Sequence, residues 1–479
     1  MQRERFGSRL GFILVSAGCA IGIGNIWKFP YLAVEYGGSA FLLVYIAFLL
    51  LLGIPIIVCE LSVGRASRKS IALSHNELEP SGTNWHRIRW VAMVGNYIII
   101  MFYTTICGWM LHYFFKMLKG DFLGSGANTV VEQFDKTLAT PTSLFFWTVL
   151  VILIASGICS IGLRNGIERI MKIVIIIFFA LMIILAFNSL TLPNASEGIK
   201  QFLVPDFRKL ISNGIGNAVF AAMSQAFFTL SLGIGNMAIF GSYLSKSYSI
   251  TGDAINVVIL DTIVSLLAAI IIIPACVSFG MDVASGPRLT FITLPKIFAN
   301  MNGGRIWGTL FFFSAFVATF STIIAIYENI ISISIDIFSC TRKKAAAVNI
   351  ALTTLLSLPC ILGFNVLSGI QPLGVGTTIM DLEDFIVTSN ILPIGSVIFL
   401  LFCTNKNGWG WDNFIKEVNL GKGAKFPEKL RSVMTNVLPW IIIIIYLKGY
   451  YDTFSEHGLV IFVFWMINAL IFVQIVSTE

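Results

Sequence analysis

The chain interrupts its first long apolar stretch at residues 18–30, which read Gly18-Cys19-Ala20-Ile21-Gly22-Ile23-Gly24-Asn25-Ile26-Trp27-Lys28-Phe29-Pro30. Glycine costs up to about 1 kcal/mol in a helix interior, so three glycines within seven residues favour an unwound backbone. Irregular backbone at membrane depth persists only where it lines a cavity or is buried in protein. The stretch therefore predicts a broken transmembrane helix with a binding site near the bilayer midplane.

Composition assigns the chain to the integral membrane proteins. Of its 479 residues 56% are hydrophobic and only 12% are charged, whereas soluble domains carry about 25% charged residues. We predict an all-α protein, one transmembrane domain over residues 1–479, with twelve spans of about 20 residues. The predicted spans are 10–34, 40–62, 90–115, 144–163, 170–190, 215–244, 254–279, 306–335, 347–366, 377–403, 433–447 and 459–476.

The basic residues predict the orientation. With twelve spans both termini lie on one side, and the segments on that side hold 21 of the 32 lysines and arginines. Positively charged loops face the cytoplasm, so we expect a multi-pass protein with cytoplasmic termini. The sequence shows neither a paired-cysteine extracellular loop nor long termini, which suggests a prokaryotic inner membrane. The net charge of +7 is then a signal of topology, and no nucleic-acid partner is expected.

Cysteine and histidine patterns argue against an enzyme. The eight cysteines lie almost wholly within apolar spans without paired spacing, and the four histidines, His75, His86, His112 and His457, share no helix face. No set of nucleophile, base and oxyanion donors is apparent either. We expect no catalytic residues.

A second glycine-rich interruption follows five spans after the first. Residues 228–235 read Phe228-Thr229-Leu230-Ser231-Leu232-Gly233-Ile234-Gly235. Glycine-broken spans at matching positions of two halves are typical of inverted-repeat transporters, although single glycines also serve helix packing. We expect five-helix repeats over residues 10–190 and 215–403, discontinuous helices 1 and 6, and two additional C-terminal helices over 433–476.

The chain resembles the neurotransmitter:sodium symporter family and is similar to its bacterial amino-acid transporters, such as the leucine transporter. The resemblance covers nearly the whole chain. It is carried, beyond residues 18–30, by Arg9-Leu10-Gly11-Phe12, Gly37-Gly38-Ser39-Ala40-Phe41, Gly53-Ile54-Pro55, Glu60-Leu61-Ser62-Val63-Gly64-Arg65, Gly166-Ile167-Glu168-Arg169 and Ser231 to Gly235. The order and spacing of these motifs make the match specific.

The resemblance implies two sodium sites. The first would use Ala20, Asn25, Thr229 and Asp261, and the second Gly18, Ile21, Ala318, Ser321 and Thr322. Oxygen ligands of this kind suit a hard cation in a bilayer that supplies none. A structural alternative for Ser321 and Thr322 is hydrogen bonding to their own helix carbonyls.

Asp261 departs from the chloride-dependent relatives, which resemble one another in carrying asparagine there and a serine one turn later. This chain has Asp261 followed by Ser265. A carboxylate within the membrane is costly unless it is paired. We therefore predict that Asp261 replaces chloride and that no chloride is required.

The substrate class is predicted from Gly22, where the family's monoamine carriers resemble one another in having an aspartate. The room left there suits the carboxylate of an α-amino acid. The expected substrate-binding residues are Cys19, Ala20, Gly22, Ile23, Gly24, Ile99, Tyr103, Ile106, Phe228, Thr229, Ser231, Ile234, Ile323 and Ile326. This lining has little polarity and favours hydrophobic or aromatic side chains, but the sequence leaves the particular amino acid open.

The resemblance also implies gates. Lys28 and Asp381 would form the outer pair, although relatives carry arginine at the first position, which binds carboxylate in a different geometry. A cytoplasmic network would join Arg3, Ser242, Tyr243 and Asp336. Arg3 alone is also explained as a positive-inside charge.

Two further positions match or depart from the family. Glu60 matches a carboxylate that braces the sixth helix. Ile176 stands where many relatives have a proline in the fifth helix, so opening to the cytoplasm by unwinding that helix is not expected.

We predict sodium-coupled import of a hydrophobic or aromatic amino acid by alternating access, with Na⁺ as the coupling ion and lipid as the surrounding partner. The alternative is a membrane sensor or channel-like protein that binds an amino acid without transporting it. Oligomeric state and ion stoichiometry are not legible from the sequence.

Overall fold

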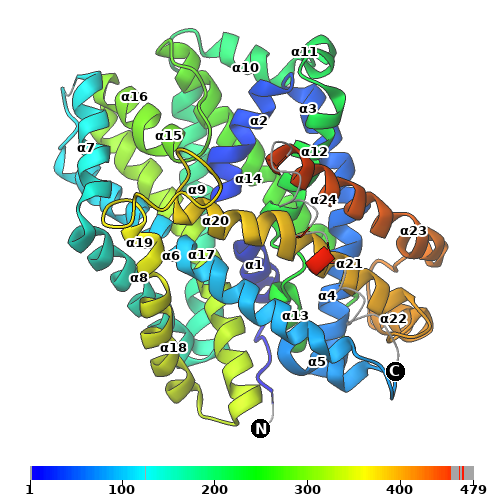
Figure 1. Ribbon diagram of the computed structural model, residues 1–479. Helices are drawn as coiled ribbons and strands as arrows, with labels where there is room; N and C mark the ends of the chain where they lie inside the picture. Colours follow the sequence, from blue (N-terminus) through cyan, green and yellow to red (C-terminus); the bar gives the residue numbers. More distant parts are fainter. Residues whose placement is uncertain (1–2, 125, 455–462, 464–465, 469–479) are drawn as a thin grey trace.

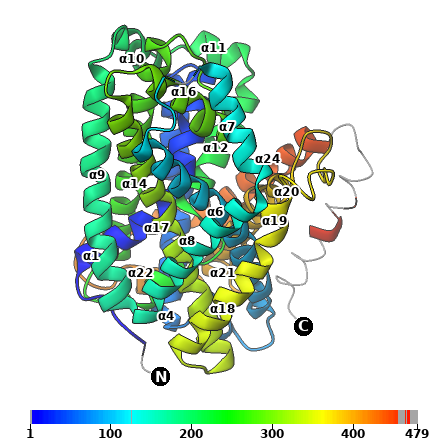
Figure 2. The same cartoon turned by 90° about the vertical axis from the view of Figure 1, so that its left-hand side faces the viewer.

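The computed structural model describes residues 3–124, 126–454, 463 and 466–468, and their secondary structure is helical. Nine continuous helices of this part are long and apolar enough to cross a membrane, and one bent pair forms a tenth span. Figures 1 and 2 show an upright bundle with α10 and α11 at one end and the N-terminus and α18 at the other. We call the latter end the N-terminal face.

The predicted spans correspond to the following elements. The first five are α1 (Arg9–Ala20) with η1 (Gly24–Lys28) and α2 (Phe29–Glu35), α3 (Ser39–Phe48) with η2 (Leu49–Gly53) and α4 (Ile54–Ser67), α6 (Ile88–Lys119), α8 (Pro141–Ile161), and η4 (Leu163–Glu168) with α9 (Arg169–Leu190). The next three are α12 (Ile215–Leu230) with α13 (Asn236–Ser242), α14 (Ile250–Ser278) and α17 (Gly304–Phe338). The last described spans are α18 (Arg342–Leu356) with α19 (Leu358–Leu362), α20 (Ile379–Ile386) with η6 (Val387–Ile391) and α21 (Leu392–Thr404), and α23 (Arg431–Asn436) with α24 (Leu438–Phe454).

Shorter helices connect these spans. They are α5 (Ile71–Leu78), η3 (Trp85–Arg87), α7 (Ala127–Ala139), α10 (Ala195–Leu203), α11 (Phe207–Ser212), α15 (Gly286–Arg288), η5 (Leu289–Thr293), α16 (Leu294–Asn300), α22 (Trp411–Val418) and η7 (Glu428–Leu430). The twelfth predicted span, 459–476, lies outside the described residues except for 463 and 466–468.

The first span is broken where the glycines predicted it. The helix α1 ends at Ala20, Ile21 is extended with ψ 111°, and the next helical turn begins at Gly24. The two halves of the span are bent by 53°. Carbonyl groups freed by the break accept hydrogen bonds from another helix, as described below, which satisfies the demand for partners at membrane depth.

The sixth span, 215–244, is also broken, as predicted for a discontinuous sixth helix. The helix α12 ends at Leu230, and Ser231, Gly233 and Gly235 all take positive φ before α13 begins at Asn236. A Cβ on Gly233 would lie 2.2 Å from the Leu392 carbonyl oxygen. Only glycine fits here, because both the backbone conformation and the space exclude a side chain.

The ninth span was predicted over residues 347–366, but in the structure it runs from Arg342 to Leu362. Thr341 caps α18 by accepting a hydrogen bond from the Lys344 amide, so the helix starts at Arg342 rather than Ala347. Three basic residues occupy the first turn of α18. The predicted span excluded them because it was drawn over apolar residues. The span ends at Leu362, and residues 363–378 form a glycine-containing loop before α20.

The centre of the bundle is α17, which packs against α6, α8, α9 and α1. It is the most completely buried of the described spans, with 78% of its central window inside the protein. Close helix contact elsewhere depends on small residues. A Cβ on Gly64 of α4 would lie 1.8 Å from the Ala238 carbonyl oxygen of α13. The second half of the sixth span is therefore held tightly against α4.

The helix α5 docks beside α21 through His75. Its imidazole is 1% exposed and lies 4.4 Å from the Phe402 ring and 5.1 Å from the Phe399 ring, measured between centroids. Burial lowers the pKa of His75 from its usual 6.5 to about 3, because the charged form would lose its hydration. The folded protein therefore holds the neutral ring.

The substitution His75→Phe is expected to reduce the loss of folding stability at acidic pH. The unfolded chain binds a proton below pH 6.5 and the folded chain does not, so stability is full above that pH and is lost as the pH falls toward 3. At pH 5 this loss amounts to about 2 kcal/mol. The apparent Tm of purified protein between pH 8 and pH 5 measures it, with Ser74→Ala, which keeps the imidazole, as control. If the apparent Tm declined equally in wild type and His75→Phe, the buried neutral imidazole would not be the cause of the pH dependence.

Candidate functional site

The two helix breaks meet at a cluster of buried oxygen atoms. The Asn25 Nδ2 lies 2.9 Å from Thr229 Oγ1, 2.8 Å from Asp261 Oδ1, 2.8 Å from Ser265 Oγ and 3.4 Å from the Asp261 carbonyl oxygen. An amide nitrogen donates only two hydrogen bonds, yet four oxygens converge on this point. The convergence of oxygens is the arrangement that a hard cation requires.

Asp261 supplies the charge of this cluster. Its carboxylate is fully buried on α14, and no lysine, arginine or histidine pairs with it among the described residues. Thr229 Oγ1 donates to Asp261 Oδ1 at 2.8 Å, and Tyr45 Oη donates to Oδ2 at 3.4 Å. A buried carboxylate without a cationic side chain fits a bound sodium ion, because a metal ion then supplies the missing positive charge.

Tyr45 is a member of this cluster that the sequence did not identify. Its hydroxyl stands out only as a polar atom in the apolar second span, where aromatic residues are common. Ser265 was considered only as the serine of an anion site. In the structure it lies on the same side as Asp261, one turn along α14, and contacts Asn25.

A second oxygen cluster joins α1 to α17. Ser321 Oγ donates to the Gly18 carbonyl at 2.7 Å, and Thr322 Oγ1 donates to the Ile21 carbonyl at 3.0 Å. Ser321 also lies 2.8 Å from the Ala318 carbonyl of its own helix, so both interpretations of this hydroxyl apply. The structure thus brings together all five predicted residues of the second site. Their oxygens suit a hard cation, although the described contacts are hydrogen bonds within the protein.

Tyr103 closes the space beside the first break. Its hydroxyl accepts a hydrogen bond from the Ile23 amide at 3.0 Å. A Cβ on Gly22 would lie 2.3 Å from the Tyr103 hydroxyl, and one on Gly24 would lie 2.5 Å from the Phe228 ring. A longer residue at position 22 would therefore displace Tyr103.

The other predicted substrate residues surround this point. Ile99 and Ile106 lie on the same α6 face as Tyr103, and α6 packs directly against α17, which carries Ile323 and Ile326. Cys19, Ala20, Ser231 and Ile234 are buried at the two breaks, and Phe228 is partly buried. The side chains of Ile234 and Ile391 lie beside Gly95 of α6, where an ideal Cβ would come within 3.2 Å and 2.8 Å of them.

Buried amides and Glu60 hold the sixth span in its broken form. Asn329 Nδ2 donates to Asn96 Oδ1 at 3.1 Å and to Asn236 Oδ1 at 3.0 Å, and Asn96 donates to the Ile234 carbonyl at 3.0 Å. The Glu60 carboxylate accepts from the Gly233 amide at 2.5 Å and from Met237 at 3.1 Å. Three asparagines inside apolar spans are the sequence signal for this network, because buried amides need hydrogen-bond partners, and none of them was predicted to belong to the site.

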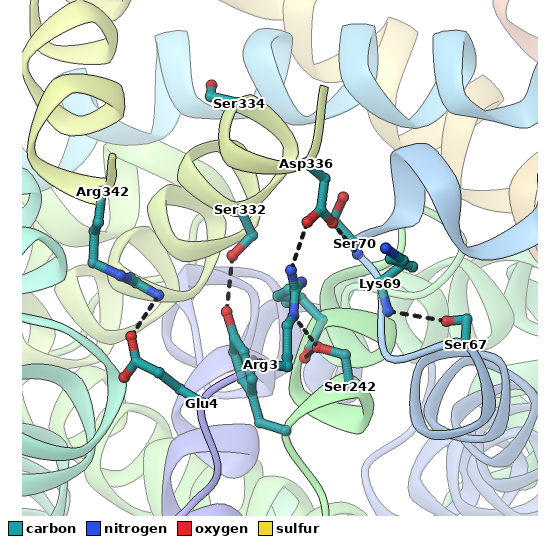
Figure 3. Close-up of polar contacts among 12 residues, drawn as sticks. Arg3, Glu4, Ser67, Lys69, Ser70, Ser242, Ser332, Ser334, Asp336 and Arg342 are labelled. Atoms are coloured by element: carbon teal, nitrogen blue, oxygen red, sulfur yellow. Dashed lines mark hydrogen bonds and ion pairs between the residues drawn. The ribbon is translucent and has the colours of Figure 1, made fainter. Parts of the chain in front are cut away.

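A polar network at the N-terminal face links the N-terminal segment to α13 and α17 (Figure 3). Arg3 pairs with Asp336 at 2.9 Å, donates to Ser242 at 3.2 Å and lies over the Tyr243 ring. The four predicted residues therefore lie together. Tyr243 Oη also donates to Glu328, which is paired with Arg342 at 2.6 Å, and Arg342 reaches Glu4 at 3.2 Å. Glu328, Arg342 and Glu4 were missed.

The predicted outer pair is not brought together. Asp381 is engaged at the start of its own helix, where it forms a capping box with Thr378, and no ion pair joins it to Lys28 in the described part of the chain. Asp384 is close enough to Lys28 for their charges to attract, although no ion pair joins them among the described residues. It lies one turn further along α20 and is partly buried. The Lys28 ammonium lies 5.4 Å from the centre of the Phe228 ring.

Asp384→Asn is expected to weaken substrate retention much more than Asp381→Asn. Losing the attraction to Lys28, at about 1.4 kcal/mol, lowers the apparent substrate affinity about tenfold. Asparagine at position 381 still accepts the hydrogen bond of the cap, so affinity there changes less than about twofold. Sodium-dependent equilibrium binding of the substrate measures both. Equal losses of substrate affinity in Asp384→Asn and Asp381→Asn would contradict the attraction between Asp384 and Lys28.

Two broken spans that meet at buried oxygen clusters are the architecture of a membrane transporter. Comparison with known proteins gives the particular group. The chain belongs to the sodium:neurotransmitter symporter family, whose model matches residues 3–125 and 127–478. It is therefore a sodium-coupled, multi-pass membrane transporter and not an enzyme, and the family resemblance and all-α fold expected from the sequence are confirmed.

Similar proteins cover most of the chain. The uncharacterized sodium-dependent transporter YhdH of Bacillus subtilis is 33% identical over 93% of this chain and 97% of its own length. The sodium- and chloride-dependent taurine transporter of Rattus norvegicus is 25% identical over 84% of this chain and 70% of its own. The crystal structure of MhsT in complex with L-phenylalanine matches with a TM-score of 0.83 and 36% identity, covering 93% of this chain and 99% of that one.

Proposed function

We propose that the protein is a sodium-coupled symporter that imports a hydrophobic or aromatic α-amino acid without requiring chloride. The observation that carries the proposal is the cluster of Asn25, Thr229 and fully buried Asp261 between the two helix breaks. It places several oxygen atoms beside a carboxylate that forms no ion pair among the described residues, next to the two helix breaks where we expect the substrate to bind. Crystallised MhsT, a similar protein, holds L-phenylalanine, which supports an amino-acid substrate.

Two sodium ions are proposed. The first would be held by Asn25 through its side-chain oxygen, by Thr229, Asp261 and the carbonyl of Ala20. The second would be held by Ser321, Thr322 and the carbonyls of Gly18, Ile21 and Ala318. In the first site Asp261 supplies the negative charge that chloride supplies in chloride-dependent transporters, so an anion has no role.

The substrate would lie between the first break and Tyr103. Its carboxylate would meet the Tyr103 hydroxyl and the amides near Ile23 and Gly24, and its ammonium the carbonyls of the sixth-span break. Gly22 supports this orientation, because a side chain there would collide with Tyr103. The side chain would contact Ile99, Ile106, Phe228, Ile323 and Ile326, which offer no charge.

Transport would follow alternating access between repeats 10–190 and 215–403, with both termini in the cytoplasm of a prokaryotic cell. The Arg3–Asp336 pair would close the cytoplasmic side in this conformation. Each charge that crosses 100 mV yields about 2.3 kcal/mol and each tenfold gradient about 1.4 kcal/mol. Two ions would supply roughly 7 kcal/mol, which is enough for about 10⁵-fold accumulation.

Uptake into proteoliposomes tests the proposal. All twenty amino acids are supplied with an inward sodium gradient, with potassium in place of sodium, and with gluconate in place of chloride. We expect sodium-dependent uptake of apolar or aromatic amino acids that continues without chloride. Sodium-dependent binding without uptake or counterflow would favour the sensor or channel-like alternative. Uptake that stops in gluconate would contradict the role of Asp261.

A further inference from the structure

A cavity of about 300 Å³ opens beside the Arg3 network at the N-terminal face. The region appears in Figure 3, where Arg3 lies between Asp336 and Ser242, and Glu4 points toward Arg342. Its walls come from the N-terminal segment, the turn after α4, the end of α13, the end of α17 and the start of α18. The lining residues are Arg3, Glu4, Arg68, Lys69, Tyr243, Ser332, Ile335, Asp336, Ser339 and Arg342.

The carboxylates that line this cavity are already engaged. Asp336 uses one oxygen for Arg3 at 2.9 Å and the other for the Ser70 amide at 2.6 Å. Glu4 uses one oxygen for Arg342 at 3.2 Å and the other for the Leu163 amide at 2.7 Å. Each oxygen of these two carboxylates therefore already has a partner within the protein.

The cationic groups are not all engaged. The Arg3 Nη2 is buried and has no hydrogen-bond partner among the described residues. Arg68 donates to the Ser242 carbonyl at 3.1 Å, but neither it nor Lys69 forms an ion pair within the described part of the chain. Burial and the nearby charge of Arg5 lower the pKa of the Arg68 guanidinium, which indicates crowded positive charge. The cavity thus combines unused donors with excess positive charge.

We propose that this cavity binds a phosphoryl anion between Arg3, Arg68 and Lys69. Guanidinium groups match the geometry of phosphate oxygens, and a lysine adds a mobile donor. The volume admits a phosphate group with a small organic substituent. A phospholipid headgroup and free phosphate share this chemistry, because both present phosphate oxygens to cationic side chains.

A bound phosphoryl group would connect two segments that belong to different parts of the bundle. Arg3 lies before α1, and Arg68 and Lys69 follow α4. These segments must separate if the N-terminal face is to open. The ligand therefore stabilises the closed form of this face and acts as a regulator rather than as a transported substrate.

Thermal stability tests the site without depending on transport. The full-length protein in a neutral detergent is titrated with inorganic phosphate against gluconate at constant sodium concentration and ionic strength. We expect a saturable rise in apparent Tm of about 3 °C for wild type, as a ligand of the folded state produces. Lys69→Gln and Arg68→Gln should lose most of this rise and Lys69→Arg should keep it. The matched control is Lys343→Gln, which removes an exposed lysine outside the cavity.

The source of the phosphate is distinguished in nanodiscs. If a headgroup occupies the cavity, nanodiscs with phosphatidylglycerol should stabilise wild type and Lys343→Gln more than Lys69→Gln, relative to phosphatidylcholine alone. Added phosphate should then have no further effect. Equal responses of wild type and Lys69→Gln to phosphate and to phosphatidylglycerol would overturn the proposal, because the effect would be general screening. The absence of any response in wild type would overturn it too.

Discussion

Asp261→Asn should reduce the apparent sodium affinity of substrate binding by two to three orders of magnitude. A carboxylate about 4 Å from a sodium ion contributes about 4 kcal/mol at an effective dielectric constant of 20, and asparagine removes that charge while keeping the size. The substitution leaves Tyr45 and Thr229 in place. Titration of substrate binding with sodium, at constant ionic strength, measures the change.

The same variant also tests chloride independence. With asparagine at position 261, a chloride ion near Ser265 supplies the missing negative charge, so chloride should restore a large part of the lost affinity in Asp261→Asn and have no effect on wild type. Thr262→Val is the matched control, because its hydroxyl bonds only to the Val258 carbonyl of the same helix. An Asp261→Asn protein with wild-type sodium affinity would exclude this carboxylate as a ligand.

Glu60→Gln should have the second largest effect, on stability and transport together. The Glu60 carboxylate accepts from the Gly233 and Met237 amides, and each charge-assisted hydrogen bond contributes roughly 1.5–3 kcal/mol. Glutamine presents an N–H₂ group to one of these donors. We expect the apparent Tm to fall by about 5 °C and uptake to fall at least tenfold, since the broken segment carries Thr229 and Ser231 at its start.

Ser62→Ala supplies the control for Glu60. It lies two residues along the same helix and bonds only to the Val58 carbonyl of its own helix, so its removal should leave the apparent Tm within 1 to 2 °C, about the value of one local hydrogen bond. A Glu60→Gln protein as stable as Ser62→Ala would show that the backbone holds the break without the carboxylate.

Much of this architecture was predictable because it depends on local chemistry. Glycines in an apolar span cannot favour a continuous helix, and both breaks lie where the sequence indicated, at residues 21–23 and 231–235. Likewise, Asn25, Thr229 and Asp261 of the first predicted ligand set and all five residues of the second lie together, since oxygen-bearing side chains and freed carbonyls have few partners in a bilayer. Their function as ligands stays a proposal.

The contacts that the sequence did not predict depend on the rotation of a helix about its axis or on packing between segments that are distant along the chain. Asp381 and Asp384 belong to one turn, and only the start of α20 at Ile379 determines which of them caps the helix and which faces Lys28. In the same way, Glu328 reaches Arg342 and Tyr243 because α13, α17 and α18 end side by side. Spacing along the chain contains no information about such contacts.

By itself, the sequence determined that this chain is a membrane protein, that two of its helices unwind and that a carboxylate lies within the bilayer, because hydropathy and backbone preference act over a few residues. Only the tertiary structure decided which partners meet: Tyr45 with Asp261, the Asn96–Asn329–Asn236 amides with the sixth span, and unpaired Arg68 and Lys69 in one cavity. These contacts depend on the relative rotation and depth of whole helices, which the packing of the entire bundle sets.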